Sequence, residues 1–481
     1  MSYRKVTEFK TVAEFANYVK SERFSFGVSP EVPADGSAAL ARPLEYAGRT
    51  IGNRWAILPM EGWDCQADGT PSEFTRRRWL RFAASGAKLI YGVEAGAVIH
   101  SGRSNPRQLL VDEHTLPALR ELCREMRRTH REKFGTDDDL MIGLQLTHSG
   151  RFSHPNRDDR LEPRTAYAHP LLDRKFGCSA ANVVTDDEVG VIVRCFVRAA
   201  RVAYEAGFDF VDVKHAHGYL AHEFLTAVDR PGRYGGAFEN RTRFFREIAE
   251  GIRAEVPHLA LSARLSIFDI MPFVKGDDGV GRPMEWNGPY PYAVGGDGGG
   301  LEMDRELRDT VRFAGVLKEY GVGLICATIG SPYYNVHMQR PAYYPVCDGY
   351  EMPEHPLYNV GRHILAVRRF KELCPDLLVV GSGYSCLQEY LPNVAEYSLR
   401  NGWTDFVGIG RMVLSYPEIC ADVLAGRPLD RRRICRTFGD CTNAPRHGMI
   451  SGCYPLDDFY KCRAEAARLK VIKQSNREVM E

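Results

Sequence analysis

The strongest candidate for chemistry is residues 214–220, which read Lys-His-Ala-His-Gly-Tyr-Leu directly after the apolar run Phe210–Val213. Ammonium, imidazole and phenol groups can hold or move protons, so Lys214, His217 and Tyr219 are candidate acid–base residues. Histidine and tyrosine are also often structural, and a satisfied polar cluster at the end of a strand is the alternative. The run alone leaves both interpretations open.

Two further polar residues lie near the ends of apolar runs. Gln145 lies at the start of Gln-Leu-Thr-His-Ser-Gly-Arg, and an amide can pair with the edge of a heterocycle that offers both donors and acceptors. Arg264 lies inside Ser-Ala-Arg-Leu, where a charge needs an anionic or polar partner. That partner is either an acidic side chain in an internal salt bridge or a bound ligand.

Glycines follow the last two apolar runs, in Gly381-Ser382-Gly383 and in Gly408-Ile409-Gly410-Arg411. Glycine lets backbone N–H groups approach an oxyanion closely, and arginine adds a charged fork. In (β/α)8 barrels the loops after strands seven and eight often bind phosphate. The pair of motifs therefore predicts a phosphate site.

These motifs need elements that bring them together. Eight short apolar runs read as buried parallel strands: Trp55–Met60, Lys88–Tyr91, Met141–Leu146, Phe210–Val213, Leu259–Leu265, Gly323–Ile329, Leu377–Val380 and Asp405–Ile409. Amphipathic segments lie between them. The clearest helix is Asp186–Ala206, with Thr185 and Glu188 as a capping box and Gly207 as a left-handed stop.

Alternation of strands and helices predicts an α/β fold, a (β/α)8 TIM barrel. A doubly wound sheet is the rival. The barrel is favoured because polar, glycine-rich clusters follow nearly every strand at its C-terminal end. We expect an N-terminal extension over residues 1–50, the barrel over 51–428 and a C-terminal tail with cysteines over 429–481.

Composition excludes several classes of protein. Among 481 residues, 63 Lys+Arg balance 62 Asp+Glu, which argues against a nucleic-acid binder. No apolar run is long enough for a membrane span, and no signal peptide is visible. The 13 cysteines then read as reduced thiols of a cytoplasmic protein. A small-molecule substrate is expected, and whether the chain forms a homo-oligomer stays open.

Together the motifs are highly specific. Asn53-Arg54 with Pro59-Met60, the Gln145 motif, His217-Gly-Tyr-Leu, the Tyr234-Gly-Gly segment and Gly408-Ile-Gly-Arg resemble the old yellow enzyme family of FMN-dependent oxidoreductases, in the right order from about residue 50 to 425. The resemblance implies a (β/α)8 barrel that binds FMN at its C-terminal mouth, with NADH or NADPH as hydride donor.

The resemblance also implies roles. Gln145 would bond the pyrimidine edge of the flavin, and Arg264 would lie near N1 and C2=O, where reduced flavin is negative. Ala95 would be the small residue after the second strand. The remaining cofactor contacts fall at the first strand and in the phosphate segment: Pro59, Met60, Glu61, Gly381, Ser382, Gly383, Gly410 and Arg411.

The family's substrate motif usually reads His-Gly-Ala-(His/Asn)-Gly-Tyr-Leu, with two donors that hold a carbonyl oxygen and a tyrosine that protonates carbon. Here His217 and Tyr219 match, but Lys214 replaces the first donor and His215 the glycine. Lysine is a compact cation on a flexible stem. It would favour a developing enolate or an anionic substrate, or contact the flavin instead.

The tail resembles that of larger relatives, 2,4-dienoyl-CoA reductase and trimethylamine dehydrogenase, in which four cysteines bind a [4Fe–4S] cluster. Cys435, Cys441 and Cys453 fit three positions of that frame, but Phe438 stands at the second position and cannot bind iron. Nothing in the spacing of Cys462 supports it as a substitute. No cluster and no other metal are expected.

The favoured function is NAD(P)H-linked reduction of the C=C bond of an α,β-unsaturated carbonyl compound. One rival is a dehydrogenase or demethylase that oxidises an amine or a saturated carbonyl compound, which the altered Lys214–His215 pair keeps open. Another is a flavin-binding protein without turnover. The physiological substrate and the choice between NADH and NADPH stay open.

Overall fold

The computed structural model describes residues 3–296, 298–299, 302–347 and 349–478. Its centre is a closed barrel of eight parallel strands, in the order β3-β4-β6-β7-β8-β11-β12-β13, which confirms the (β/α)8 prediction. The barrel strands are β3 (Trp55–Ile57), β4 (Leu89–Ile90), β6 (Met141–Thr147), β7 (Phe210–His215), β8 (Ala260–Ser266), β11 (Leu324–Thr328), β12 (Leu378–Gly381) and β13 (Phe406–Ile409).

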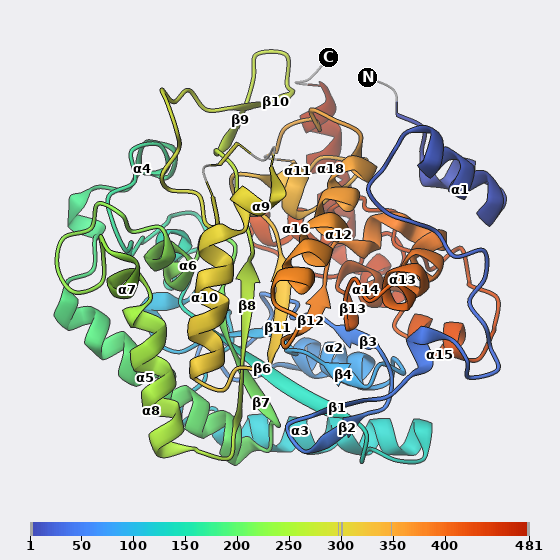
Figure 1. Cartoon of the computed structure of the whole chain (residues 1–481), viewed down its shortest axis with the longest axis horizontal. Helices are drawn as coiled ribbons and strands as arrows, with labels where there is room; N and C mark the ends of the chain where they lie inside the picture. Colours follow the sequence, from blue (N-terminus) through green and yellow to red (C-terminus); the bar gives the residue numbers. More distant parts are fainter. Residues whose placement is uncertain (1–2, 297, 300–301, 348, 479–481) are drawn as a thin grey trace.

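Helices surround the strands (Figure 1). The outer layer consists of α2 (Glu73–Ala83), α3 (Leu116–Phe134), α5 (Asp186–Ala206), α8 (Arg243–Glu255), α10 (Arg308–Glu319), α12 (Pro356–Leu373), α13 (Leu391–Arg400) and α15 (Ile419–Leu424). Helix α5 has the predicted bounds: the Thr185–Glu188 capping box forms, and Gly207 ends the helix at a φ of 95°. Among the described residues, no helix is long and apolar enough to cross a membrane.

Short elements complete the loops. They are β5 (Ala95–Ala97), α4 (Leu172–Phe176), α6 (Leu220–Leu225), α7 (Phe238–Arg241), the hairpin β9 (Phe273–Lys275) and β10 (Gly281–Pro283), α9 (Met303–Glu306), α11 (Val336–Gln339) and α14 (Arg411–Ser415). The tail contains α16 (Asp440–Asn443), α17 (Asp458–Lys461) and α18 (Ala464–Glu478). Helix α18 lies toward the upper end of the molecule in Figure 1.

The N-terminal segment contacts two sides of the barrel. Helix α1 (Val12–Ser21) places Phe15 against Tyr390, with ring centroids 4.4 Å apart. The hairpin β1 (Leu44–Tyr46) and β2 (Arg49–Ile51) lies at the lower end in Figure 1. Ile51 packs there against apolar side chains from inside the barrel.

Side chains of each strand alternate between the barrel interior and the helix layer, as the period of two requires. On β7, Phe210 belongs to the interior apolar cluster, while Val211 and Val213 pack toward the helices. Asp212 and Lys214 therefore continue the interior row upward. The apolar cluster that contains Phe210 fills the lower interior of the barrel, and polar side chains occupy the upper interior.

Candidate functional site

A cavity of about 330 Å³ opens at the C-terminal ends of the strands, within the range of roughly 300–1,000 Å³ typical of ligand sites. All but one of the residues assigned to the site from sequence line it: Pro59, Met60, Glu61, Ala95, Gln145, Lys214, His217, Tyr219, Arg264, Ser382, Gly383, Gly410 and Arg411. Seven of the eight barrel strands, with the loops that follow them, thus bring the motifs together.

Gly381 is the exception. It does not line the cavity, and its N–H donates to the Thr404 hydroxyl at 3.1 Å. A Cβ at Gly381 would meet Thr404 and the Tyr384 ring, both on the outer side of β12. The alternation along β12 turns Gly381 away from the interior that Val380 and Ser382 face. Its assignment to the phosphate contacts is corrected accordingly.

His217 sits in a strained turn at the end of β7. Its φ is 69°, and that of Gly218 is 77°, a region that non-glycine residues rarely occupy. Ser266 accepts the His217 N–H at 3.0 Å, and Ser331 donates to its carbonyl oxygen at 2.8 Å. These bonds hold the imidazole toward the cavity, and backbone strain of this kind is commonly kept at functional sites.

The imidazole of His217 is neutral. Burial, with Arg264 and Lys214 nearby, holds its pKa well below the ordinary value. The Gln339 amide nitrogen lies 3.1 Å from Nε2 and donates to it, which leaves the ring proton on Nδ1. His217 can therefore act as a neutral hydrogen-bond donor through Nδ1.

Tyr219 is a buried acid with two oxygen neighbours. Its hydroxyl lies 3.0 Å from the Tyr333 hydroxyl and 3.4 Å from Glu61 Oε1. Burial, followed by the Glu61 charge, raises the pKa of Tyr219 well above 10. The phenol stays protonated at neutral pH and can give a proton only to a strongly basic atom.

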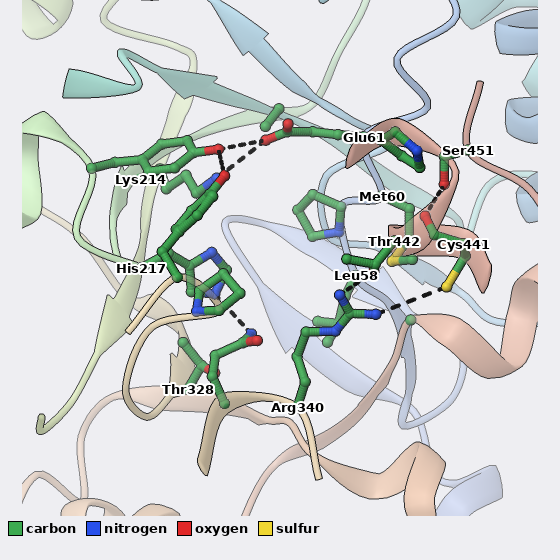
Figure 2. A pocket seen from close by; sticks show the side chains of 18 of the residues that line it. Leu58, Met60, Glu61, Lys214, His217, Thr328, Arg340, Cys441, Thr442 and Ser451 are labelled. Carbon is green, nitrogen blue, oxygen red and sulfur yellow. Dashed lines mark hydrogen bonds and ion pairs between the residues drawn. The ribbon is translucent and has the colours of Figure 1, made fainter. Parts of the chain in front are cut away.

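Lys214 contacts a carboxylate rather than standing free in the cavity (Figure 2). Its ammonium lies 3.3 Å from Glu61 Oε1 and 3.7 Å from the centroid of the Tyr219 ring. Ser104 holds the other Glu61 oxygen at 2.9 Å. Burial lowers the pKa of Lys214 to about 8. Lys214, Glu61 and Tyr219 form one network, which the sequence motifs did not reveal.

His215 lies on the other side of β7. Its Nδ1 bonds the Val213 carbonyl at 3.0 Å, and its ring packs against Phe245 and Phe313 of the helix layer. It does not line the cavity. The glycine-to-histidine departure in the motif is therefore a packing change outside the site.

Gln145 and Arg264 face the cavity from β6 and β8. Gln145 donates to Asp212 Oδ2, so its amide nitrogen is held and its carbonyl oxygen is oriented. The Arg264 side chain has no hydrogen-bond partner or ion pair in the described part of the chain, and its buried Nε is unsatisfied. No salt bridge to Arg264 forms among the described residues, although the Asp212 carboxylate lies near it: burial raises the pKa of Asp212, and the Arg264 charge opposes that rise. A buried cation with an unsatisfied N–H group suits a bound anion or acceptor.

The glycine loops after β12 and β13 form another part of the cavity wall. Gly383 has a φ of 91°, and a Cβ there would meet the His363 ring at 2.9 Å. Gly410 precedes α14, and Arg411 extends from it to the Pro341 carbonyl at 3.0 Å. Together with Gln145 and Arg264, this donor set suits a planar heterocycle that carries a phosphate.

Sequence reasoning missed the part of the wall that Phe152 and His154 supply after β6, and it missed two further parts. One is the loop after β11, which supplies Tyr333, Gln339 and Arg340. The other is the tail, which folds back over the mouth with five residues: Cys441, Thr442, Pro445, Arg446 and Ser451. No local pattern predicts where such loops fold, although Tyr333 and Tyr334 carry phenols, a group that can donate a proton.

Comparison with known proteins decides the family. Residues 39–280 match the model of the NADH:flavin oxidoreductase / NADH oxidase family. The chain belongs to this family. It is 30% identical over 383 residues to an NADPH dehydrogenase of Geobacillus sp. (strain WCH70), which covers 79% of this chain and 91% of that protein. The family implies a flavin-linked enzyme that uses a nicotinamide donor, and the old yellow enzyme resemblance is confirmed.

Solved structures share the fold. An old yellow enzyme homologue from Zymomonas mobilis superposes with a TM-score of 0.55 at 19% identity, covering 81% of this chain and 93% of that one. A 2-naphthoyl-CoA reductase complex gives a TM-score of 0.64 at 19% identity and covers 88% of this chain. This chain spans only 57% of that larger protein.

Proposed function

We propose that the cavity binds FMN and that the enzyme uses NAD(P)H to reduce the C=C bond of an α,β-unsaturated carbonyl compound. The observation that carries the proposal is the arrangement at the end of β7. A neutral His217 donor and a protonated Tyr219 face one cavity, and the wall of that cavity contains the unsatisfied cation Arg264. The NADPH dehydrogenase relatives support a nicotinamide donor.

The flavin would be held by this chain's own residues. Gln145 and Arg264 would bind the ring, and Ser382, Gly383, Gly410 and Arg411 would surround the phosphate. Pro59, Met60 and Ala95 would border the ring from the first two strands. When bound, FMN supplies hydride transfer from NAD(P)H to the β-carbon of the substrate.

His217 would bind the substrate carbonyl, and Tyr219 would supply the proton. The Nδ1–H of His217 would donate to the substrate carbonyl oxygen and stabilise the negative charge that develops there. Tyr219 would protonate the α-carbon, and Tyr333, 3.0 Å away, connects its hydroxyl to the cavity edge. Lys214, placed over the Tyr219 ring, would stabilise the tyrosinate rather than clamp the carbonyl.

Steady-state turnover tests this function. The purified enzyme, with NADPH or NADH, is offered cyclohexenone in one series and amine donors with an artificial electron acceptor in the other. We expect nicotinamide-dependent formation of cyclohexanone. Amine oxidation without enone reduction would favour the dehydrogenase alternative. Failure of NAD(P)H to bleach bound flavin would favour a flavin-binding protein without turnover.

A further inference from the structure

The cavity wall carries more positive than negative charge. Five cationic side chains line it, against the carboxylate of Glu61: Lys214, Arg264, Arg340, Arg411 and Arg446. Water screens charges poorly in such a hollow, so this excess attracts anions.

Most of these cations have a partner in the proposed holoenzyme. Lys214 pairs with Glu61. Arg264 and Arg411 would meet the flavin ring and the phosphate. Arg446 directs Nη2 to the Pro332 carbonyl at 3.2 Å. Arg340 is left without an anion.

Arg340 has only uncharged contacts. Its Nη1 donates to the Thr442 hydroxyl, and Nη2 lies 3.9 Å from Cys441 Sγ (Figure 2). Within the described ranges, no carboxylate comes within ion-pair distance of it. Burial, with Arg411 and Arg446 nearby, lowers its pKa to about 10, so it is still a cation at neutral pH. A desolvated cation without a counter-ion is unfavourable, and a bound anion relieves that cost.

Arg340 also lies beside the carbonyl-binding side of the site. Gln339, its neighbour at the end of α11, donates to His217. Near the same loop, Tyr333 stacks on Phe152 with ring centroids 3.8 Å apart and planes 12° apart. A flat substrate could lie along this aromatic wall with one end at His217 and another at Arg340.

We propose that the physiological substrate carries a carboxylate, which Arg340 binds while the substrate's carbonyl oxygen lies at His217. This inference rests on the proposed function and narrows its substrate class from neutral enones to enones with an anionic group. It assigns a specificity role to a residue outside the β7 motif.

Two substrates with the same carbon skeleton, one charged and one uncharged, test whether Arg340 binds a carboxylate. The probes are 3-oxocyclohexene-1-carboxylate and its methyl ester, given with NADPH to the wild type, to Arg340→Gln and to Arg432→Gln, an exposed control. We expect Arg340→Gln to lower the acid-to-ester ratio of kcat/KM at least about tenfold, because the variant removes the charge that pairs with the carboxylate. FMN content and the rate of flavin reduction by NADPH should match the control.

Binding supplies a second readout that needs no turnover. Benzoate and benzamide are titrated calorimetrically into the oxidised holoenzymes, and only benzoate should bind at least about tenfold more weakly to Arg340→Gln. If the wild type reduces neither enone, the proposed function fails, and the benzoate titration still decides the role of Arg340.

Three results would overturn the role of Arg340. An unchanged acid-to-ester ratio with unchanged benzoate affinity would show that Arg340 recognises no carboxylate. Loss of FMN from Arg340→Gln would place Arg340 at the cofactor phosphate. Slower flavin reduction by NADPH, with unchanged enone kinetics, would place it at the phosphates of the nicotinamide donor.

Discussion

The family's usual motif has a histidine where this chain has Lys214, and the lysine changes the chemistry at the end of β7. The lysine lies between the Glu61 carboxylate and the face of the Tyr219 ring. A cation over a phenol ring favours the deprotonated form, whereas burial and the Glu61 charge disfavour it. In the proposed reaction, this opposition would keep Tyr219 protonated in the resting site and ease the loss of its proton to the substrate.

Tyr219→Phe tests the proton donor. We expect FMN content and flavin reduction by NAD(P)H to stay nearly unchanged, because neither needs the phenol proton. Reoxidation by cyclohexenone should slow at least about tenfold, the lower part of the range for a positioned general acid. Reoxidation by a quinone, which needs no protonation of carbon, should hardly change. Anaerobic stopped-flow absorbance measures each step.

Matched variants separate the donor from its neighbours. Tyr333→Phe removes the adjacent hydroxyl and should have a smaller effect on enone reduction. His217→Ala should impair both binding and reduction of the enone, because it removes the carbonyl partner. An enone rate in Tyr219→Phe equal to that of the wild type would show that Tyr219 has a packing role, and Tyr333 would then be the donor.

The buried ammonium of Lys214 gives a pH-dependent cost. Its pKa is about 8 in the folded chain, against about 10.4 when unfolded. The unfolded state therefore binds the proton more tightly than the folded state. Below about pH 8 the charged ammonium is buried in the folded chain and lowers the unfolding free energy by its full amount. Above about pH 10.4 the amine is neutral in both states and this cost disappears. Relative to Lys214→Met, the wild type should gain roughly 3 kcal/mol of unfolding free energy across that window.

Denaturant unfolding of the two proteins at matched pH values measures this difference. Other lysines and tyrosines titrate in both proteins and cancel in the comparison. A difference between wild type and Lys214→Met that stays constant from pH 7 to above the window would show that the Lys214–Glu61 pair fully compensates the burial.

At the scale of elements, alternation along the strands explains which residues reach the site. The interior rows on β7 and β8 contain Lys214 and Arg264, which are paired in register across the two strands. His215 and Gly381 fall on the outer rows and are excluded. The period of two was available from the sequence, so both placements could have been predicted from the strand phase.

Separate strands also give Arg264 and Arg411 separable roles. Arg264→Ala should weaken FMN binding and lower the reduction potential of the retained flavin, because it removes a cation that stabilises the reduced, anionic ring. Arg411→Ala should weaken binding through the phosphate and leave the potential nearly unchanged. Fluorescence titration with FMN and spectroelectrochemistry measure the two quantities. Equal potentials in both variants and the wild type would remove the role given to Arg264.

The eight strands and α5 could be predicted because their signals are local: apolar runs of strand length, and a capping box followed by glycine. The β7 motif and the glycine loops could be placed because parallel strands end at one face of the barrel. Three contacts could not be predicted from the sequence: Glu61 with Lys214, Gln339 with His217, and the tail with the mouth of the cavity. Each depends on a long-range contact that no periodicity encodes.

At the scale of the whole molecule, the tail closes the cavity rather than forming a separate unit. Cys441 and Ser451 line the mouth, while the Phe438 ring packs against Tyr344 with centroids 5.4 Å apart. In the residues the structure describes, the tail sulfurs do not form a group of three ligand atoms within 4.8 Å. The one group that meets this criterion, Asp64, Cys65 and Glu94, is bridged by Arg78.

The prediction that Cys435, Cys441 and Cys453 hold no iron–sulfur cluster rests on Phe438, which stands at a ligand position and cannot bind iron. Anaerobic purification followed by iron and sulfide analysis checks this, with the Cys441→Ser variant for comparison. The variant should contain as little iron as the wild type. Near-stoichiometric iron and sulfide in the wild type, lost in Cys441→Ser, would show that a further ligand replaces the position of Phe438.

The central claim is that this barrel holds FMN at the mouth and passes reducing equivalents from NAD(P)H to an enone. The direct test is one anaerobic experiment on the purified holoenzyme, followed by its visible spectrum. NADPH should bleach the flavin bands, cyclohexenone should restore them, and the released cofactor should be FMN. A protein that takes up no FMN, or a bleached flavin that oxygen restores but cyclohexenone does not, would contradict the account.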